Sequence, residues 1–240
     1  MAFFNSIPKT VLILGGEGGI GKALKNEIKE NTNSSVFYTS RKNNNLNNVL
    51  QLDGLSDTSW INLCNILRER KIRFDLIINC IGILHDKKIG LFPEKSLKEV
   101  NIDNFIENIK KNTLITMLSL KYLINFIKKD QSIYASLTAR LGSISDNNIG
   151  GWISYRASKA AEHMVIKTAS IEYRRNYKNL ISVGLHPGTV DTRLSKPYIK
   201  FSKNILTPEI AAKNLVGVLN NIETKDNGKI LDYKGDIVPY

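Results

Sequence analysis

The chain has 240 residues, 42% of them hydrophobic and 23% charged, which suits one soluble domain spanning residues 1–240. Two cysteines without a CxxC pattern and three scattered histidines exclude a disulfide framework and predict no metal site. The apolar start lacks the features of a signal peptide and no run is long enough for a membrane span, so we expect a cytoplasmic protein. The net charge of +12 favours an anionic partner, but the lysines are dispersed, so we expect neither specific nucleic-acid nor membrane binding.

Short apolar runs alternate with longer helical patterns along the chain. The strand candidates are Thr10–Leu14, Ser35–Thr39, Val49–Leu52, Phe74–Cys80, Ser132–Leu137 and Leu180–Leu185. The helix candidates are Gly19–Glu30, Ser56–Lys71, Asn101–Lys128 with an interruption, Ser154–Tyr177 and Pro208–Asn221. This alternation predicts βαβ units, and uninterrupted apolar strands predict a sheet that is covered on both faces. The expected fold class is therefore α/β, a single-domain Rossmann fold with a doubly wound parallel β-sheet and helices on both faces.

A glycine-rich turn, LGGEGGIGKAL, follows directly after the first predicted strand. Its key positions are Gly15, Gly19, Ile20 and Gly21, and the next predicted helix begins within it. Glycines let the backbone approach a diphosphate, and a helix N-terminus offers free N–H groups and the positive end of the helix dipole. The strand–turn–helix context predicts a dinucleotide-binding site, with a flexible glycine loop as the alternative.

The end of the second predicted strand, YTSRKNN, bears on the choice of dinucleotide. An NAD site usually has an acidic residue here, which bonds the ribose 2′-hydroxyl. This chain has Ser40, Arg41 and Lys42 instead, and a hydroxyl beside two cations suits a 2′-phosphate. We therefore expect NADP (NADPH) as the cofactor rather than NAD. Glu17 in the glycine turn counts against a nearby phosphate, and an ordinary basic loop is the alternative interpretation.

A tyrosine and a lysine lie four residues apart in SYRASK, at Tyr155 and Lys159. In a helix this spacing puts both side chains on one face, so that they can act on one point. The spacing alone does not identify a site, because Tyr38 and Lys42 have it too. The pair therefore gains its meaning from the other motifs of the chain.

In their order and spacing, the motifs of the chain resemble the short-chain dehydrogenase/reductase family along almost its full length. The elements of the resemblance are the glycine turn, Asp53 in LDGLSD, NCIG with Asn79 and Gly82, Asn112 in IKKNTLITML, YRASK with Tyr155 and Lys159, and HPGTVDTRLSKPY with Pro187, Gly188 and Thr192. Within the family, ARLGSISDN, GGWISYRASKAA and NGKILDYKGDIVPY are similar to the C-factor or sniffer-type carbonyl reductase branch.

The resemblance implies a catalytic set and a set of cofactor contacts. Tyr155 would be the general acid/base, Lys159 would lower its pKa and bond the nicotinamide ribose, and Asn112 would hold a water molecule. Asp53 would contact the adenine and Thr192 the nicotinamide carboxamide. The alternatives are a surface amide for Asn112 and a helix N-cap for Thr192. The remaining implied cofactor contacts are Gly15, Gly19, Ile20, Gly21, Asn79, Gly82, Pro187 and Gly188, beside Ser40 and Arg41 of the second strand.

One departure from the family pattern concerns the catalytic serine, which usually precedes the tyrosine within an SS-x-x-G stretch. At the usual distance before Tyr155, about thirteen residues, this chain has Gly142. If Gly142 is instead aligned with the glycine of the family motif, Ala139 stands where the serine is expected. Ser143 or Thr138 could supply the hydroxyl. We favour Ser143, because it lies nearest the family spacing.

The expected function is that of an NADP(H)-dependent oxidoreductase, which interconverts a small-molecule carbonyl and an alcohol by hydride transfer. The alternative is a nucleotide-binding signalling or regulatory protein on the same fold, with weak or no turnover, and the displaced serine favours it. The set of Tyr155, Lys159 and Asn112 favours the enzyme, because a binding module does not need a proton relay. The resemblance also implies a homodimer or homotetramer.

Overall fold

A computed structural model of the protein describes residues 3–4, 9–42, 46–201 and 204–240. Its strands are β1 (Thr10–Leu14), β2 (Ser35–Ser40), β3 (Val49–Gln51), β4 (Leu76–Asn79), β5 (Ser132–Leu137), β6 (Leu180–His186), β7 (Thr189–Val190), β8 (Ile205–Leu206), β9 (Ile230–Asp232) and β10 (Ile237–Val238). One eight-stranded sheet has the order β10-β9-β6-β5-β4-β1-β2-β3, and β7 pairs with β8 separately. Its neighbouring strands are parallel except for β9 and β10, which confirms the predicted α/β fold.

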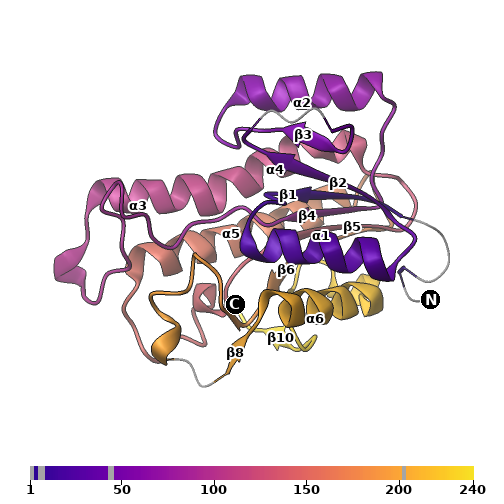
Figure 1. The fold of residues 1–240 in the computed structure, drawn as a ribbon. Helices are drawn as coiled ribbons and strands as arrows, with labels where there is room; N and C mark the ends of the chain where they lie inside the picture. Colours follow the sequence, from indigo (N-terminus) through magenta and orange to yellow (C-terminus); the bar gives the residue numbers. More distant parts are fainter. Residues whose placement is uncertain (1–2, 5–8, 43–45, 202–203) are drawn as a thin grey trace.

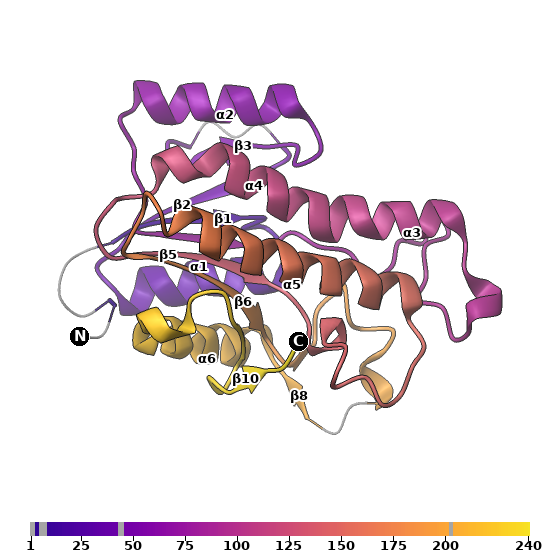
Figure 2. The ribbon, with the colours of Figure 1, turned by 180° about the vertical axis from the view of Figure 1, so that it is seen from behind.

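Helices cover both faces of the sheet. They are α1 (Gly19–Asn31), α2 (Asp57–Glu69), α3 (Ile102–Asn108), α4 (Ile115–Leu123), α5 (Ile153–Tyr173) and α6 (Pro208–Asn221), with a π-helical segment η2 (Ile109–Leu114) between α3 and α4. The short 3₁₀ turns are η1 (Leu97–Glu99), η3 (Ile124–Phe126), η4 (Arg140–Gly142), η5 (Ile199–Phe201) and η6 (Thr224–Asp226). Helices α1 and α6 lie side by side on one face (Figure 1), while α4 and α5 lie on the other (Figure 2).

The strand sequences divide their side chains between two apolar layers. Along β1, Val11 and Ile13 point toward the layer under α1 and α6, whereas Leu12 and Leu14 point toward the layer under α2 and α4. All four side chains are fully buried. This alternation is the period of two that a strand imposes, and it explains why β1 reads as a continuous apolar run.

The predicted helices and strands are all present, three of them with the predicted bounds (Thr10–Leu14, Ser132–Leu137 and Pro208–Asn221) and the others with shifted ends. The helix expected at Ser154–Tyr177 ends at Tyr173, because the N–H groups of Asn176 and Tyr177 bond back to the Tyr173 carbonyl and close a turn. The interruption expected within Asn101–Lys128 is the π-helical segment. The sequence interpretation missed β7 to β10, whose two or three residues are too short for a periodic pattern.

The sheet register places the strand ends that carry the predicted site in one row. Leu14 pairs with Asn79, Asn79 with Ser136, and Ser136 with Gly184. The loops that follow β1, β4, β5 and β6 therefore leave the sheet at the same edge. In doubly wound sheets, ligands bind at this carboxyl edge, where the strand order reverses between β1 and β4.

Two further observations concern the chain as a whole. No helix in the described ranges is long and apolar enough to cross a membrane. Among the same residues, no group of three or more histidine, cysteine or acidic side chains could hold a metal ion. The assignment of residues 1–240 to one domain stays a prediction, since that range includes positions outside the described residues.

Candidate active site

The glycine turn between β1 and α1 is shaped by steric requirements. Gly15 has a φ of +76°, and its N–H donates to Thr39 Oγ1 at 2.9 Å. A Cβ on Gly21 would collide with the Gly15 carbonyl oxygen, and one on Gly19 would lie 2.7 Å from Thr192 Cγ2. No side chain among the described residues caps α1, so its first N–H groups are open to a ligand. The turn thus fits a phosphate group, and Ile20 lies half-buried behind it.

The end of β2 gathers exposed charge next to the glycine turn. Ser40 is buried, and its hydroxyl donates to the Glu17 carboxylate at 2.8 Å. Arg41 and Lys42 are exposed, and neither side chain forms a hydrogen bond or ion pair with a residue that the structure describes. Two free cations and one carboxylate therefore surround the place where the sequence predicts the 2′-phosphate.

Asp53 lies on the same side of the molecule, in the loop after β3. Its carboxylate is exposed and accepts the Leu55 N–H at 3.1 Å, while its own N–H donates to Ser59 Oγ at 2.9 Å. These bonds fix the loop as a tight turn ahead of α2. One carboxylate oxygen, Oδ2, has no bond within the described residues, so Asp53 can still accept a hydrogen bond from a ligand.

The loop after β4 begins after Asn79 and passes close to Lys159 of α5. Asn79 is fully buried, and its amide nitrogen donates to Thr116 Oγ1 at 3.0 Å and to Ser136 Oγ at 3.1 Å. Gly82 follows, where a Cβ would lie 3.1 Å from Asn112 Oδ1 and 3.7 Å from Lys159 Nζ. Asn79 therefore ties β4 to its neighbours, and Gly82 leaves room for the predicted catalytic side chains.

Tyr155 and Lys159 share the face of α5 that looks onto the carboxyl edge of the sheet. Lys159 is buried, and its Nζ donates to the Leu137 carbonyl at 3.2 Å. Tyr155 is largely buried and packs with Leu84 and Ala139, but its hydroxyl forms no hydrogen bond with any described residue. The phenol is thus held by apolar contacts while its acidic group stays free.

Glu162 completes this group, and the sequence interpretation missed it. The side chain is fully buried, and its Oε2 accepts the Lys159 Nζ at 2.7 Å. Its Oε1 accepts the hydroxyls of Ser136 at 2.7 Å and Thr116 at 2.9 Å. The signal in the sequence is an acidic residue three positions after Lys159, which puts it on the same helix face as Tyr155.

The electrostatics of this group correct one expectation. Burial raises the pKa of Tyr155, the Lys159 cation lowers it, and the Glu162 carboxylate raises it again, so the net shift is upward rather than downward as predicted. For Lys159, burial lowers the pKa, but Glu162 and Tyr155 together raise the pKa by more, so the net shift is upward and the lysine stays protonated. The expected effect of Lys159 on Tyr155 is present, but it is outweighed.

Asn112 lies within the π-helical segment and is fully buried. Its Oδ1 accepts the Ile83 N–H at 2.7 Å, and its Nδ2 donates to the Ile83 carbonyl at 3.0 Å and to Ser158 Oγ at 3.0 Å. The alternative of a surface amide is therefore wrong. The side chain joins the loop after β4 to α5, and π segments of this kind are frequent at functional sites.

The candidate hydroxyls lie on the loop after β5 and both have partners. Thr138 Oγ1 lies 2.9 Å from His163 Nε2, and Ser143 Oγ accepts the Asp146 N–H at 3.1 Å. Ala139 of this loop shares an apolar cluster with Tyr155, and Leu141 packs against the same cluster. The position aligned with the family serine thus lies beside the tyrosine, but it carries a methyl group.

A group of aromatic side chains, Trp152, Tyr198 and His85, lies next to Tyr155 and forms an aromatic wall. The Trp152 ring lies 6.2 Å from that of Tyr155 and 5.1 Å from that of Tyr198, whose ring is 5.7 Å from His85. Trp152 has a left-handed backbone with a φ of +54°, which is strained for a non-glycine residue. The Glu94 carboxylate accepts from Ser154 and so fixes the start of α5.

The loop after β6 returns to the glycine turn. Pro187 is buried, and Gly188 has a φ of +81°, which aims the chain into β7. Thr192 lies against Gly19, and its N–H donates to Ser195 Oγ at 3.1 Å. The fold therefore brings this loop, the glycine turn and the α5 group to one edge of the sheet.

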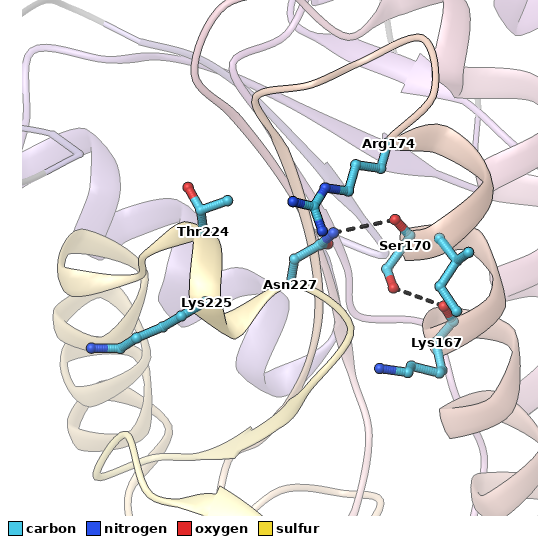
Figure 3. A pocket seen from close by; sticks show the side chains of 7 residues that line it. Lys167, Ser170, Arg174, Thr224, Lys225 and Asn227 are labelled. Carbon is cyan, nitrogen blue, oxygen red and sulfur yellow. Dashed lines mark hydrogen bonds between the residues drawn. The ribbon is translucent and has the colours of Figure 1, made fainter.

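A separate hollow lies at the other end of α5 (Figure 3). Its volume is about 390 Å³, and it is lined by Lys167, Ser170, Ile171, Arg174, Thr224, Lys225 and Asn227. The Asn227 amide donates to the Ser170 carbonyl at 3.2 Å and closes its floor, and Lys225 pairs with Glu223 at 2.6 Å. None of the predicted site residues lines this hollow.

Comparison with known proteins finds relatives over the whole length of the chain. It is 24% identical over 238 residues to 1-hydroxy-2-glutathionyl-2-methyl-3-butene dehydrogenase of Rhodococcus sp. (strain AD45), covering 96% of this chain and 99% of that protein. It is 31% identical over 106 residues to C-signal of Myxococcus xanthus, covering 44% of this chain and 60% of that protein.

Solved structures share the fold. The carbonyl reductase Sniffer of D. melanogaster is 21% identical with a TM-score of 0.84, covering 98% of this chain and 100% of that one. The NADPH-bound carbonyl reductase from chicken fatty liver is 22% identical with a TM-score of 0.84, covering 97% of this chain and 94% of that one. The family model described as short chain dehydrogenase matches residues 9–202. The chain therefore belongs to the short-chain dehydrogenase family of oxidoreductases.

Proposed function

We propose that this protein is an NADP(H)-dependent oxidoreductase that interconverts a carbonyl and an alcohol by hydride transfer, with Tyr155 as general acid/base. The observation that carries the proposal is the free hydroxyl of Tyr155. It stands beside an aromatic wall and one helical turn from Lys159, at the sheet edge that also bears the glycine turn. A buried phenol with no protein partner has its proton available for a substrate oxygen.

The cofactor choice is supported at the β2 end of the site. The cationic side chains of Arg41 and Lys42 have no partner among the described residues and suit a 2′-phosphate, and the Ser40 hydroxyl donates to Glu17 beside them. Two proteins of similar fold are described as NADPH-bound and NADP-bound, the chicken carbonyl reductase and a short-chain dehydrogenase/reductase of Burkholderia multivorans. We therefore propose NADPH as the cofactor, with NAD as the less favoured one.

The contacts proposed for the cofactor follow the sheet edge. Gly15, Gly19, Ile20 and Gly21 would hold the diphosphate at the free N-terminus of α1. The other proposed contacts are Ser40, Arg41, Asp53, Asn79, Gly82, Tyr155, Lys159, Pro187, Gly188 and Thr192. Asn79 would act through its backbone, because its side chain is buried in bonds to Thr116 and Ser136.

The chemistry of the chain's own residues centres on a proton. When bound, a reduced nicotinamide supplies the hydride. Negative charge then develops on the substrate oxygen, and the Tyr155 hydroxyl delivers its proton to that oxygen. The Lys159 cation acts in favour of the tyrosinate that remains, and the Glu162 carboxylate opposes this effect. Asn112 would hold a water molecule through which the proton is replaced.

The substrate oxygen needs a second hydrogen-bond donor, and we propose Ser143 for it, with Thr138 as the alternative. The Ser143 hydroxyl accepts a bond from Asp146 and keeps its own proton to donate, whereas Thr138 is engaged with His163. Alanine substitution of each separates the two, because loss of the orienting hydroxyl lowers kcat for the substrate and loss of the other does not.

The surroundings of the site support a homodimer or homotetramer. Large apolar side chains are exposed on the neighbouring helices α3, α4 and α5, which lie together in Figure 2. These side chains are Ile102, Phe105, Ile106, Met117, Met164 and Ile171. Light scattering after gel filtration measures the oligomeric state.

Both cysteines, Cys64 and Cys80, are free thiols, which supports a cytoplasmic location.

A regulatory protein that binds the nucleotide without turnover is the second candidate. The methyl group of Ala139 beside Tyr155 favours it, because the residue at this position cannot orient a substrate oxygen. The partial similarity to C-signal of Myxococcus xanthus belongs with this alternative. Tight NADPH binding without turnover on any carbonyl would support it.

The experiment that tests the proposal is the loss of NADPH absorbance with a panel of aldehydes, ketones and quinones. Wild type is expected to consume NADPH with at least one of them, and Tyr155→Phe to do so at a rate lower by about 10²–10⁴. Unchanged turnover in the variant would sink the mechanism.

A further inference from the structure

The buried face of α5 contains a carboxylate that the proposed reaction does not use. Glu162 has no exposed surface and lies one turn beyond Lys159. A buried charge is costly unless it is paired, so its position requires a partner and calls for an explanation. The partner is Lys159, whose Nζ lies 2.7 Å from Glu162 Oε2.

The pair is held from three directions. Lys159 Nζ also donates to the Leu137 carbonyl at the end of β5. On the other carboxylate oxygen, the hydroxyls of Ser136 on β5 and Thr116 on α4 both donate to Glu162. Each oxygen of Glu162 is thus bonded, and the lysine head group is fixed between a helix and a strand.

We propose that Glu162 is a positioning residue for Lys159: it fixes the ammonium group beside Tyr155 and cancels its charge, so that the tyrosine is kept as a proton donor for carbonyl reduction. This inference rests on the proposed function. It assigns to the site a preference for the direction of reduction, because a neutral ion pair stabilises tyrosinate far less than a lone ammonium group does.

Among the described residues around Glu162, no other group neutralises the Lys159 charge beside Tyr155. On its own helix it faces Lys159 and Tyr155. From β5 it faces Ser136 and Tyr134, and burial and the same carboxylate raise the Tyr134 pKa. From α4 it faces Thr116. His163, next to Glu162 on α5, also lies close enough to Lys159 to feel its charge, and burial and that charge lower the pKa of His163 to about 4, so its ring is neutral in the pH range of the test. Among the described residues, Lys159 is therefore the cation of this buried group and Glu162 its anion.

The consequence concerns the pH dependence of the two directions. Reduction needs the protonated phenol and fails as the pH rises through the Tyr155 pKa, while alcohol oxidation needs tyrosinate and rises in the same range. Without the Glu162 charge, Lys159 acts on Tyr155 uncompensated. The alkaline limb of reduction and the rise of oxidation should then both move to lower pH.

The test uses Glu162→Gln, which removes the charge and keeps the shape. The Gln oxygen can still accept from Lys159, and its amide can donate to Ser136 and Thr116, since hydroxyl groups can reverse their roles. We expect both pH limbs to move down by about one pH unit or more. In Glu162→Asp, which keeps the charge, both pH limbs should lie close to their wild-type pH values.

Glu94→Gln is the matched control, because it removes another buried carboxylate at the start of α5 that does not touch Lys159. Its pH limbs should stay in place even where its rate falls. Limbs that stay in place in Glu162→Gln, or that move equally in Glu94→Gln, would overturn the proposal.

A second readout needs no substrate and separates this inference from the proposed function. The tyrosinate absorbance of Tyr155 is the difference between the pH titrations of a protein and of its Tyr155→Phe form. That step should occur at lower pH in Glu162→Gln than in wild type. A shifted step without turnover in wild type would support the inference and contradict the enzyme, and an unshifted step would overturn the inference.

Discussion

Each end of the candidate site has a hydrogen-bonded carboxylate, and the two carboxylates lie in opposite surroundings, because Glu17 is exposed and Glu162 is buried. At the β2 end, the Ser40 hydroxyl donates to Glu17 at 2.8 Å, beside the exposed side chains of Arg41 and Lys42. At the α5 end, Lys159 donates to Glu162 at 2.7 Å, and both are buried. Solvent screens the exposed charges of Glu17, Arg41 and Lys42, whereas the charges of the second group are surrounded by protein.

This difference in surroundings decides how much each charge matters. Exposed ion pairs contribute about 0.2–1 kcal/mol, while removing one partner of a buried pair costs about 3–5 kcal/mol. The β2 end can therefore change its charges at little cost to the fold, which suits the selection of a cofactor. The α5 end cannot change its charges without a large loss of stability, which suits a site that fixes the position of the Tyr155 proton.

Lys159→Met should have the largest effect. It removes the cation, leaves Glu162 without its partner, and should lower kcat by about 10²–10⁴ and stability by about 3–5 kcal/mol. Steady-state kinetics and urea unfolding measure the two losses. The double variant Lys159→Met/Glu162→Gln should regain most of the stability and none of the activity. Equal loss of stability in the single and double variants would contradict the buried-pair account.

The pH dependence of stability should also come from the α5 end. Burial and the Lys159 charge lower the pKa of His163 to about 4, so the native state binds its proton later than the unfolded chain does. Stability is then fully present above the unfolded value near pH 6.5 and is lost as the pH falls toward 4, by about 2 kcal/mol between pH 7.5 and pH 5.

His163→Gln measures this contribution by urea unfolding at the two pH values. The variant should lose less stability on acidification than wild type does. The loss should not vanish, because burial and the Arg140 charge lower the pKa of His186 to about 4 as well. An acid-induced loss as large in the variant as in wild type would show that His163 titrates normally.

Arg41→Ala should have the smallest effect and should act on binding alone. We expect about threefold to tenfold weaker NADPH binding and unchanged NADH binding, with no change in the rate of hydride transfer once the cofactor is bound. Fluorescence titration with each cofactor measures it. Glu17→Gln is the opposite control, since loss of the carboxylate should tighten NADPH binding. Equal weakening for both cofactors in Arg41→Ala would contradict the NADPH preference.

The parts of the site that the sequence predicts are those with local spacing. A glycine turn needs glycines at fixed positions for steric reasons, as at Gly15 and Gly21. Two side chains that share a helix face lie four positions apart in the sequence, as Tyr155 and Lys159 do. Such local patterns can be recognised in the sequence without knowledge of the fold. The doubly wound sheet follows in the same way from the alternation of apolar runs and helical patterns.

The parts that the sequence does not predict depend on which strands become neighbours. An acidic residue on a helix usually faces water, so Glu162 draws no attention until β5 and α4 bring Ser136 and Thr116 against it. The aromatic contacts of Tyr198 and His85 join residues far apart in the chain. The upward shift of the Tyr155 pKa depends on Glu162 and on burial, and neither is visible in the YxxxK spacing.

The most direct test of the account is the behaviour of Tyr155→Phe with NADPH bound. The variant loses one hydroxyl that has no partner within the described residues, so its stability should equal that of wild type, and a saturating NADPH concentration separates hydride transfer from cofactor binding. In a single turnover with an aldehyde that wild type reduces, it should transfer hydride about 10²–10⁴ times more slowly. A transfer rate equal to that of wild type would contradict the central claim that this phenol donates the proton.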